Sequence, residues 1–306
     1  MSADAADART GIVGGPDAAE LRELERDVRA ALRSGDQSAL RTLGWGEVGP
    51  VLGWPADEPA FALKRLPPFA GRAACEAFAL VLHDYLAALA QQGLECMPTE
   101  VRVVEGGDQT IGYVVQRRLP PGCLVPEVLR AGDPAAGHPA IEAIVDADIT
   151  IPRPLLALDG QASNYAWVDG RLLYLDVTTP LLFDDAGRLR MDIDLLLGSL
   201  PAVLRPAVRR WVVPGLLRRF RDPRAVLLDM LGNLIKERLD AWLPVAIAAT
   251  AGRVDPPLSA EEVRRSYRSD ALLWEVLLRL RRIDRAWQHH VRRRAYPYLL
   301  PGAIER

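Results

Sequence analysis

A glycine-rich turn followed by an isolated lysine is the feature that most constrains this chain. Residues 44–51 read GWGEVGPV, and Lys64, one of only two lysines in a chain that otherwise uses arginine, follows downstream. The glycines Gly44, Gly46 and Gly49 would let the backbone approach phosphate oxygens, because no Cβ stands in the way. A lysine on a later strand supplies a compact ammonium group. This order predicts a phosphate cradle of strand, turn, a strand carrying Val51, and a strand carrying Lys64.

The glycine turn taken alone has a second interpretation as an ordinary β-hairpin turn. A dinucleotide-binding fingerprint fits poorly, because its third glycine opens a helix. Here Gly49 is followed by Pro50 and then by residues 51–55, VLGWP, which break or oppose a helix. The rest of the chain must therefore decide between a nucleotide site and a plain hairpin.

A second group of polar residues lies about a hundred residues downstream. Asp159 and Asn164 have the spacing D-x-x-x-x-N after the apolar run 155–158. Residues 165–175 then predict a strand, an Asp-Gly turn and a strand that ends on Asp176. We expect the three side chains at one end of this hairpin, where a carboxylate can orient a hydroxyl and an amide with a carboxylate can hold magnesium. Each residue alone also fits a turn or a loop cap, but their order behind Lys64 favours phosphoryl transfer.

With these motifs the chain resembles the protein-kinase-like superfamily, specifically the branch of aminoglycoside phosphotransferases and choline kinases. That branch carries H-G-D-x-x-x-x-N, a strand, a turn, a strand and a further aspartate, and Asp159, Asn164 and Asp176 match its polar positions. The resemblance covers about residues 38–200. It departs in two places: Ala157-Leu158 replaces the histidine and glycine before Asp159, and Val177 replaces the glycine after Asp176.

The resemblance implies an α+β, two-lobed kinase-like fold, with a small antiparallel-sheet N-lobe over 17–120 and a larger, mainly helical C-lobe over 121–306. Residues 1–16 are expected to be a mobile tail. It also implies an ATP- and Mg²⁺-dependent phosphotransferase that acts on a hydroxyl or amino group of a small molecule, with Asp159 as the catalytic carboxylate. Asn164 and Asp176 would hold the metal. The departures keep two alternatives open: a nucleotide-binding pseudokinase or regulatory protein without turnover, and an AMP transferase.

Three further predictions concern residues around this site. Glu76, in the first turn of a helix predicted over 72–92, is the candidate partner of Lys64, although it could equally complement the helix N-terminus. Gln116 opens the segment 116–122, which is either an interlobe hinge that binds an adenine edge or a plain linker. An aspartate within 188–200, Asp192 or Asp194, either braces the catalytic loop or simply begins a helix.

Apolar periodicity outlines the remaining elements. Strands are predicted over 38–46, 47–54, 60–66, 99–105 and 110–118, and helices over 18–34, 72–92, 188–200, 201–221, 223–249, 259–268 and 270–295. The last helix has an apolar stripe that includes Ile283, Trp287 and Val291, with arginines opposite. We interpret that stripe as core packing; the alternative is a helix lying on an anionic membrane.

Composition limits the class of protein. The chain has 306 residues, 49% of them hydrophobic, and a net charge of −2, which suits two well-packed lobes and argues against nucleic-acid binding. Cys75, Cys96 and Cys123 lack the spacing of a disulfide framework or a zinc site. The first sixteen residues lack a signal peptide's basic start and apolar core, and no later run reads as a membrane span. We therefore expect a cytoplasmic protein without membrane association.

Overall fold

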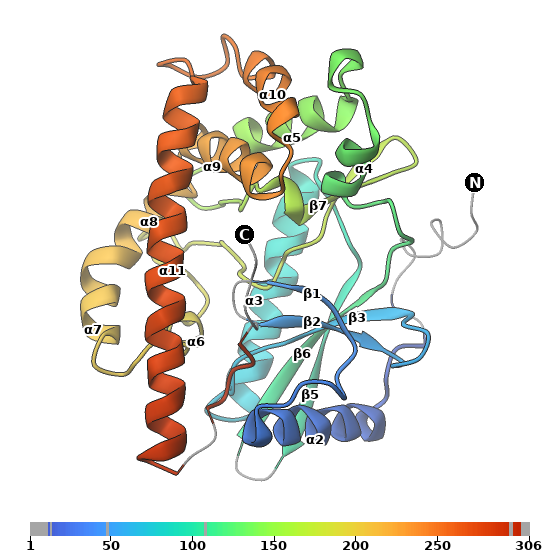
Figure 1. Cartoon of the computed structure of the whole chain (residues 1–306), viewed down its shortest axis with the longest axis vertical. Coiled ribbons are helices and arrows are strands. Elements are labelled where there is room, and N and C mark those ends of the chain that lie inside the picture. Colours follow the sequence, from blue (N-terminus) through green and yellow to red (C-terminus); the bar gives the residue numbers. More distant parts are fainter. Residues whose placement is uncertain (1–11, 13, 47–48, 107–108, 294–295, 301–306) are drawn as a thin grey trace.

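A five-stranded antiparallel sheet forms one part of the fold, and helices form most of the rest (Figure 1). The computed structural model describes residues 12, 14–46, 49–106, 109–293 and 296–300. The sheet has the strand order β1-β2-β3-β6-β5, which places β3 at its centre. Its strands are β1 (Thr42–Trp45), β2 (Pro50–Trp54), β3 (Phe61–Arg65), β5 (Thr99–Gly106) and β6 (Gln109–Arg117). The predicted α+β class and all five predicted strands of this sheet are confirmed, with shorter bounds for the first three.

The two faces of this sheet pack against different partners. On one face, buried side chains such as Leu63 and Ile111 meet helix α2 (Ala18–Ser34). Asp17 and Glu20 form a capping box at the start of α2, and Gly35 ends it with a left-handed φ of 80°. On the other face, Val114 joins a second core that includes helix α3 (Arg72–Gln91). Because side chains alternate along a strand, Lys64 points away from α2, to the face that Leu63 does not occupy.

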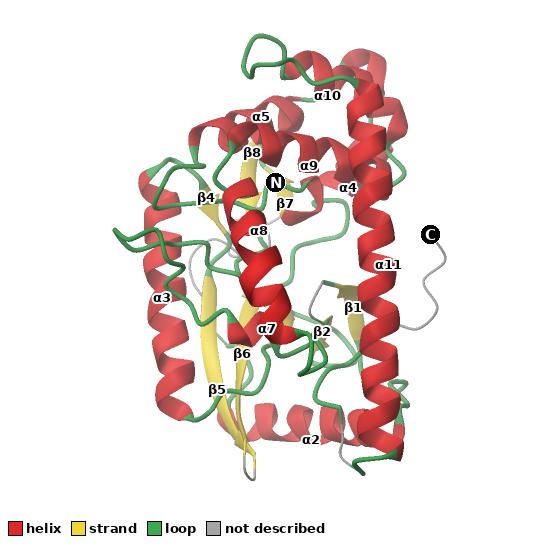
Figure 2. Ribbon diagram, turned by 90° about the vertical axis from the view of Figure 1, so that its left-hand side faces the viewer, coloured by secondary structure: helices red, strands yellow, loops and turns green. Residues whose placement is uncertain are grey.

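Helix α3 connects the sheet to the helical part of the molecule. It buries Cys75, Phe78, Leu82, Tyr85 and Leu89 in the main core. By length and composition alone α3 also meets the criteria for a membrane-spanning helix, contrary to our expectation that no such run exists. In the fold it is a helix with one face in the core, lying on the opposite side of the molecule from the longest helix (Figure 2).

A second, three-stranded sheet carries the predicted catalytic hairpin. Its strand order is β4-β8-β7, with β4 at Glu95–Cys96, β7 at Tyr165–Val168 and β8 at Arg171–Tyr174. Asp169 and Gly170 join β7 to β8 with φ of 50° and 75°, the backbone that a two-residue type I′ turn requires. The predicted Asp-Gly turn is therefore confirmed. Strand β4, which runs parallel to β8, was not predicted because two residues are too short for a periodic signal.

The helical part contains short elements and one long helix. Its helices are α4 (Val125–Ala131), α5 (Pro139–Thr150), α6 (Asp194–Leu197), α7 (Arg205–Ala207), α8 (Val213–Arg219), α9 (Pro223–Lys236), α10 (Leu243–Ala249) and α11 (Ala260–His290). Five of the predicted helices needed correction. The helix over 188–200 shrinks to α6, and the helix over 201–221 is interrupted by a π turn at Val208–Val212. The helix over 223–249 divides where Arg238 takes a left-handed φ of 59°, and 259–268 joins 270–295 as α11.

Helix α11 runs along the length of the molecule and packs against α9 (Figures 1 and 2). The prediction that its apolar stripe packs on the core is wrong at its C-terminal end, where Ile283, Trp287 and Val291 are 65%, 55% and 57% exposed. Residues 296–300, assigned to the second lobe from sequence, return to the five-stranded sheet. There Arg65 donates to the Pro297 carbonyl, and Leu299 packs in the core beneath α2.

A buried carboxylate fixes α2 to the central strand. Glu25, which is 2% exposed, accepts hydrogen bonds from Arg29 of its own helix, from Arg65 of β3 at 2.8 and 2.9 Å, and from Tyr113 of β6 at 2.8 Å. Burial raises the pKa of Glu25, but Arg65 more than offsets that effect with its hydrogen bonds and charge, so the pKa lies below its ordinary value. Glu25 is therefore ionised and holds the strand that carries Lys64 from the opposite face.

We expect Glu25→Ala to lower the free energy of unfolding by about 3–5 kcal/mol, because it leaves the Arg65 guanidinium buried without its anion. Urea titration measures the change. Glu23→Ala is the matched control on the same helix: Glu23 pairs with Arg26 on the surface, so its loss should change stability by less than about 0.5 kcal/mol. Because the folded-state pKa of Glu25 is lowered, its contribution is present above pH 4.5 and lost as pH falls. Equal losses in the two variants would contradict this role.

Candidate active site

The glycine turn joins β1 to β2 and leaves its backbone open to approach. Gly46 N–H donates to the Gly49 carbonyl at 2.9 Å, which closes the turn; Glu47 and Val48 lie outside the described residues. A Cβ added at Gly44 or Gly49 would meet no atom within 4 Å. Among the described residues, nothing therefore fills the space over these two glycines, where a ligand could contact the backbone.

Lys64 lies on β3, next to the strand that follows this turn, with Val51 as its direct cross-strand neighbour. Its Nζ atom is 2.9 Å from Oδ1 of Asp176, and the two side chains are 23% and 30% exposed. This ion pair connects the centre of the five-stranded sheet to the segment that directly follows β8. Two residues that are more than a hundred positions apart, both predicted from sequence as site residues, therefore meet.

Glu76 is not the partner of Lys64, and that prediction is wrong. Its side chain is 56% exposed, and it forms an ion pair with Arg72, one turn earlier on α3, at 3.6 Å. Cys75 and Phe78 are the positions that α3 turns toward the core at this point. Because successive helical residues are rotated by about 100°, this orientation leaves Glu76 on the solvent side.

Asp176 is held as a charged carboxylate. Burial raises its pKa, but the neighbouring Lys64 ammonium and two hydrogen bonds from Thr178 outweigh burial and lower the pKa below its ordinary value. Thr178 donates through Oγ1 at 2.8 Å and through its backbone N–H at 3.3 Å, both to Oδ1. The residues that replace the expected glycine-containing motif therefore support the carboxylate directly.

The loop that carries Asp159 and Asn164 is closed by hydrogen bonds to its own backbone. Asn164 Nδ2 donates to the Asp159 carbonyl at 3.1 Å, and the Tyr174 hydroxyl donates to the same oxygen at 3.4 Å. Leu175 N–H donates to the Asn164 carbonyl at 2.8 Å, which ties the loop to the residue before Asp176. Burial chiefly raises the pKa of Tyr174, and the nearby charges of Asp159 and Asp176 raise it further. The three predicted polar residues are thus gathered around the end of the hairpin.

Helix α9 holds the loop of residues 159–164 in place through hydrogen bonds, a contact that was not predicted from the sequence. Asn233 accepts from Ser163 N–H at 3.0 Å and donates to the Gln161 side chain at 3.1 Å, while Gln161 donates to Asp229 at 3.0 Å. Asn233 is 3% exposed, and burial raises the pKa of Asp229. Asp229 and Asn233 are spaced i, i+4 and are the only polar side chains between Arg224 and Lys236 of α9, so this polar pair on the core face was the signal in the sequence.

A buried acid fills the space under the loop. Asp148 of α5 is fully buried, and its Oδ1 accepts from the Tyr165 hydroxyl at 3.1 Å. Burial chiefly raises the pKa of Asp148 well above its ordinary value, with Asp159 and Asp229 adding to the effect. A Cβ at Gly160 would lie 2.2 Å from the same oxygen, so only glycine fits next to Asp159.

Gln116 clamps the two sheets together. Its Nε2 donates to the Leu175 carbonyl at 2.8 Å and to Thr99 Oγ1 at 3.0 Å. Leu175 directly precedes Asp176, so Gln116 fixes the backbone at the base of the ion pair. The Nε2 donor of Gln116 is thereby committed to contacts within the protein. Main-chain groups of residues 117–122 are therefore the candidates for contact with the base of a nucleotide.

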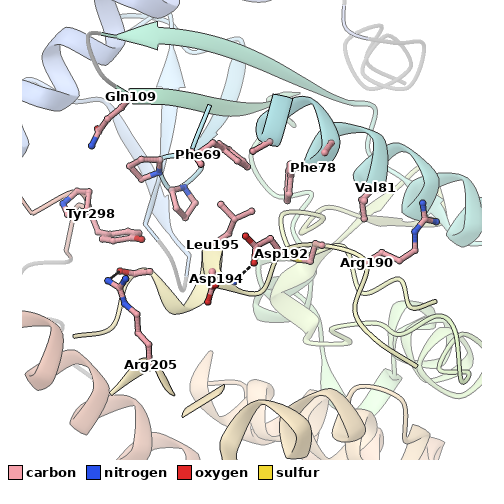
Figure 3. Close-up of a pocket in the computed structure, with 18 residues that line it drawn as sticks. Phe69, Phe78, Val81, Gln109, Arg190, Asp192, Asp194, Leu195, Arg205 and Tyr298 are labelled. Atoms are coloured by element: carbon pink, nitrogen blue, oxygen red, sulfur yellow. Dashed lines mark hydrogen bonds between the residues drawn. The ribbon is translucent and has the colours of Figure 1, made fainter. Parts of the chain in front are cut away.

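A groove of about 610 Å³ lies beside α3 (Figure 3). Its lining includes Phe69, Phe78, Val81, Gln109, Arg190, Asp192, Asp194, Arg205 and Tyr298. Lys64, Asp159 and Asp176 do not line it. Asp192 accepts from Asp194 N–H at 2.9 Å, and Asp194 pairs with Arg209. Asp192 and Asp194 were expected either to brace the loop that carries Asp159 or to begin a helix. The structure shows them at the start of α6, and the loop is braced by α9 instead.

One protein-family model matches residues 23–285, and it describes a family of unknown function, DUF6206. The chain belongs to the DUF6206 family. No curated protein matches it. The matched region includes the glycine turn, Lys64, the loop 159–164, Asp176 and the α9 brace, so the whole candidate site lies within the part shared with the family.

The oxygen atoms of Asp176 and Asn164 suit a hard cation that is also coordinated by phosphate oxygens and water. Within the described residues, no cluster of three or more His, Cys, Asp or Glu side chains is arranged to hold a metal ion. Magnesium, however, typically takes one or two protein carboxylates together with substrate phosphates and water. Asp176 supplies a carboxylate, and Asn164 uses its Nδ2 on the Asp159 carbonyl, so its Oδ1 is the atom suited to a metal.

We expect Gly160→Ala to lower the free energy of unfolding by roughly 1–3 kcal/mol, since the new methyl group meets the buried Asp148 carboxyl group. Replacing Asp148 by alanine in the same chain should recover part of that loss, giving a coupling free energy above about 0.5 kcal/mol in a double-mutant cycle. Gly215→Ala is the control, because open space surrounds that helical glycine and alanine there should be neutral or stabilising. Strict additivity at positions 148 and 160 would contradict the close contact.

Proposed function

We propose that this protein is an ATP-dependent phosphotransferase with a two-lobed, kinase-like arrangement, acting on a hydroxyl or amino group of a small molecule. The Lys64–Asp176 ion pair is the observation that carries the proposal. It joins the strand beside a glycine turn to a carboxylate that ends a hairpin, next to an Asp-x-x-x-x-Asn loop. The five-stranded sheet would be the core of the first lobe and α4 to α11 most of the second.

Each group then has a chemical role. Backbone N–H groups of the glycine turn would cover the phosphates, and the Lys64 ammonium would bind phosphate oxygens as a compact charge. Asp159 would orient the acceptor hydroxyl and take its proton. Asn164 and Asp176 would hold magnesium, which when bound neutralises charge on the phosphates. Catalysis would consist mainly of positioning and charge neutralisation, because phosphoryl transfer needs no covalent intermediate with the protein.

Nucleotide binding implies an exchange of partners at the ion pair. Lys64 and Asp176 neutralise each other through their ion pair. A bound nucleotide with its cation would offer Lys64 anionic oxygens and Asp176 a positive charge. Because both side chains remain partly exposed, this exchange leaves no buried charge without a partner at any stage.

A nucleotide-binding protein without turnover is the second candidate. Thr178 and Lys64 both bind Oδ1 of Asp176, which competes with metal ligation at that oxygen. Transfer of AMP would use the same groups, so the product identifies which group is transferred.

The two lysines of the chain provide a direct test of nucleotide binding. An acyl-phosphate analogue of ATP acylates the lysine that lies at the phosphates, and peptide mass spectrometry would then find the label on Lys64, with protection by excess ATP. Lys236, exposed at the end of α9, is the internal control. We also expect Lys64→Met to abolish the ATP-induced rise in melting temperature, whereas Lys236→Met leaves it unchanged. Equal labelling of both lysines without protection would contradict the phosphate assignment.

Substitution of the two aspartates should separate chemistry from metal binding. We expect Asp159→Asn to retain magnesium-dependent ATP binding while transfer falls by about 10²-fold or more, because the amide accepts no proton. Asp176→Asn should instead weaken the magnesium dependence of ATP binding, because the cation loses a charged oxygen ligand. Magnesium titrations of the ATP-induced thermal shift, with mass spectrometry of pooled alcohol and amine acceptors, measure both effects.

Asp185→Asn, at an exposed turn, is the control for the loss of one carboxylate. Native protein that binds ATP but modifies no acceptor would favour the candidate without turnover. Unchanged transfer in both aspartate variants would exclude a phosphotransferase at this site.

A further inference from the structure

Residues 203–219 present large apolar side chains to solvent. The segment runs from a turn through α7, the π turn at Val208–Val212 and α8. Val203, Trp211, Val212 and Leu216 are 85%, 74%, 49% and 43% exposed. We call the exposed side chains of residues 203–219 the apolar–arginine face. Apolar side chains grouped this way on one surface segment mark an interaction site more often than side chains scattered singly.

The other side of the same segment is anchored in a small core of its own. Val213 is buried with Leu197 and Leu200, and Val208 and Leu217 pack against them. The segment lies on the outside of the molecule, in front of the bulk of the chain in Figure 2. Its exposed side chains are therefore not an unfilled part of the core, and packing among the described residues does not explain them.

The charge of the segment is of one sign. Residues 201–221 contain six arginines and no acidic residue. Some of these arginines are committed within the protein: Arg209 pairs with Asp194, and Arg219 lies 3.6 Å from Asp270 of α11. Arg210 and Arg218 are exposed, and across the described parts of the chain neither side chain makes an ion pair or a hydrogen bond.

A second exposed row of the same composition lies on α11, the helix to which Arg219 is tied. Ile283, Trp287 and Val291 follow at intervals of four residues and are all more than half exposed. Arg279 and Arg282 flank this row on the surface. Two neighbouring helical segments thus combine an exposed tryptophan, aliphatic side chains and arginines.

We propose that the apolar–arginine face binds the surface of an anionic lipid bilayer. Tryptophan favours the boundary between headgroups and acyl chains, and aliphatic side chains gain free energy when they leave water there. Arginine binds lipid phosphates with its planar fork while its stem stays in apolar surroundings. The inference stands independently of phosphotransfer, and it departs from the expectation from sequence that the protein has no membrane association.

Charge favours this partner over the two other macromolecular classes. A second copy of the chain packed face to face would oppose arginines with arginines, with no acid in the segment to offset them. A nucleic acid would match the charge and could stack a base on Trp211, but it would leave the aliphatic side chains of Val203, Val212 and Leu216 in water. A bilayer satisfies both the charge and the aliphatic side chains.

Vesicle co-sedimentation of the full chain tests the proposal. We expect binding to vesicles of phosphatidylcholine mixed with phosphatidylglycerol, little binding to phosphatidylcholine alone, and weaker binding at higher salt. The double variant Arg210→Glu, Arg218→Glu should bind about tenfold more weakly or worse, since it replaces two cations near the lipid phosphates by anions. Trp211→Ala with Leu216→Ser should also weaken binding, and the native tryptophan emission should shift to shorter wavelength on anionic vesicles only.

Controls keep the test specific. Leu80→Ser removes a single exposed leucine, 68% exposed on α3, and Arg26→Glu reverses an exposed charge on α2; both should bind like the native chain. Unchanged melting temperatures would show that the variants fold. No binding to anionic vesicles, equal binding to neutral vesicles, or equal loss in the control variants would overturn the proposal. Two further results would also overturn it, in each case for a chain that does not bind vesicles. One is a concentration-dependent dimer that Trp211→Ala abolishes, and the other is binding to duplex DNA or to RNA.

Discussion

The ion pair between Lys64 and Asp176 determines how the two sheets meet. Lys64 lies on the central strand of the larger sheet, and Asp176 follows the last strand of the smaller one. Gln116 adds a second link one residue earlier, through the Leu175 carbonyl. A fully buried pair would be costly to open, and a fully exposed pair would hold nothing in place. With about a quarter of each side chain exposed, this pair can both align the sheets and give way to a charged ligand.

Buried polar groups on both sides of this ion pair hold the candidate site in place. Glu25 holds the strand of Lys64 from the α2 side, as an ionised carboxylate matched by Arg65. Asn233 and Asp148 hold the loop of Asp159 from the helical side. Burial raises the pKa of Asp148 well above its ordinary value, which favours the uncharged form of this acid beneath Asp159. Buried polar groups of this kind are costly unless their contacts are satisfied, so they specify one arrangement of the loop.

Sequence predicted what local chemistry determines and missed what distant packing determines. The Asp169–Gly170 turn and the ends of α2 follow from short signals, namely left-handed turn residues and a capping box. The gathering of Asp159, Asn164 and Asp176 followed from their places around one hairpin. The partner of Lys64 and the brace from α9 depend on contacts between residues far apart in sequence, which periodicity does not encode. Periodicity also identified the stripe on α11 without showing that nothing within the described chain covers its C-terminal end.

The departures from the kinase-like motif alter the support of the reacting groups and leave the groups themselves in place. Ala157 and Leu158, where the motif has histidine and glycine, are fully buried, and the Tyr85 hydroxyl donates to the Ala157 carbonyl at 3.1 Å. Val177, where a glycine is expected, is also fully buried, and Thr178 caps the carboxylate that precedes it. Apolar anchoring therefore replaces a polar support before Asp159, and a threonine cap replaces a flexible glycine after Asp176. In the proposed site, a stiffer Asp176 carboxylate would favour binding of a cation over movement. Under the proposed function, turnover would depend on whether Asp176 can bind a cation while Thr178 keeps its hydrogen bonds to Oδ1.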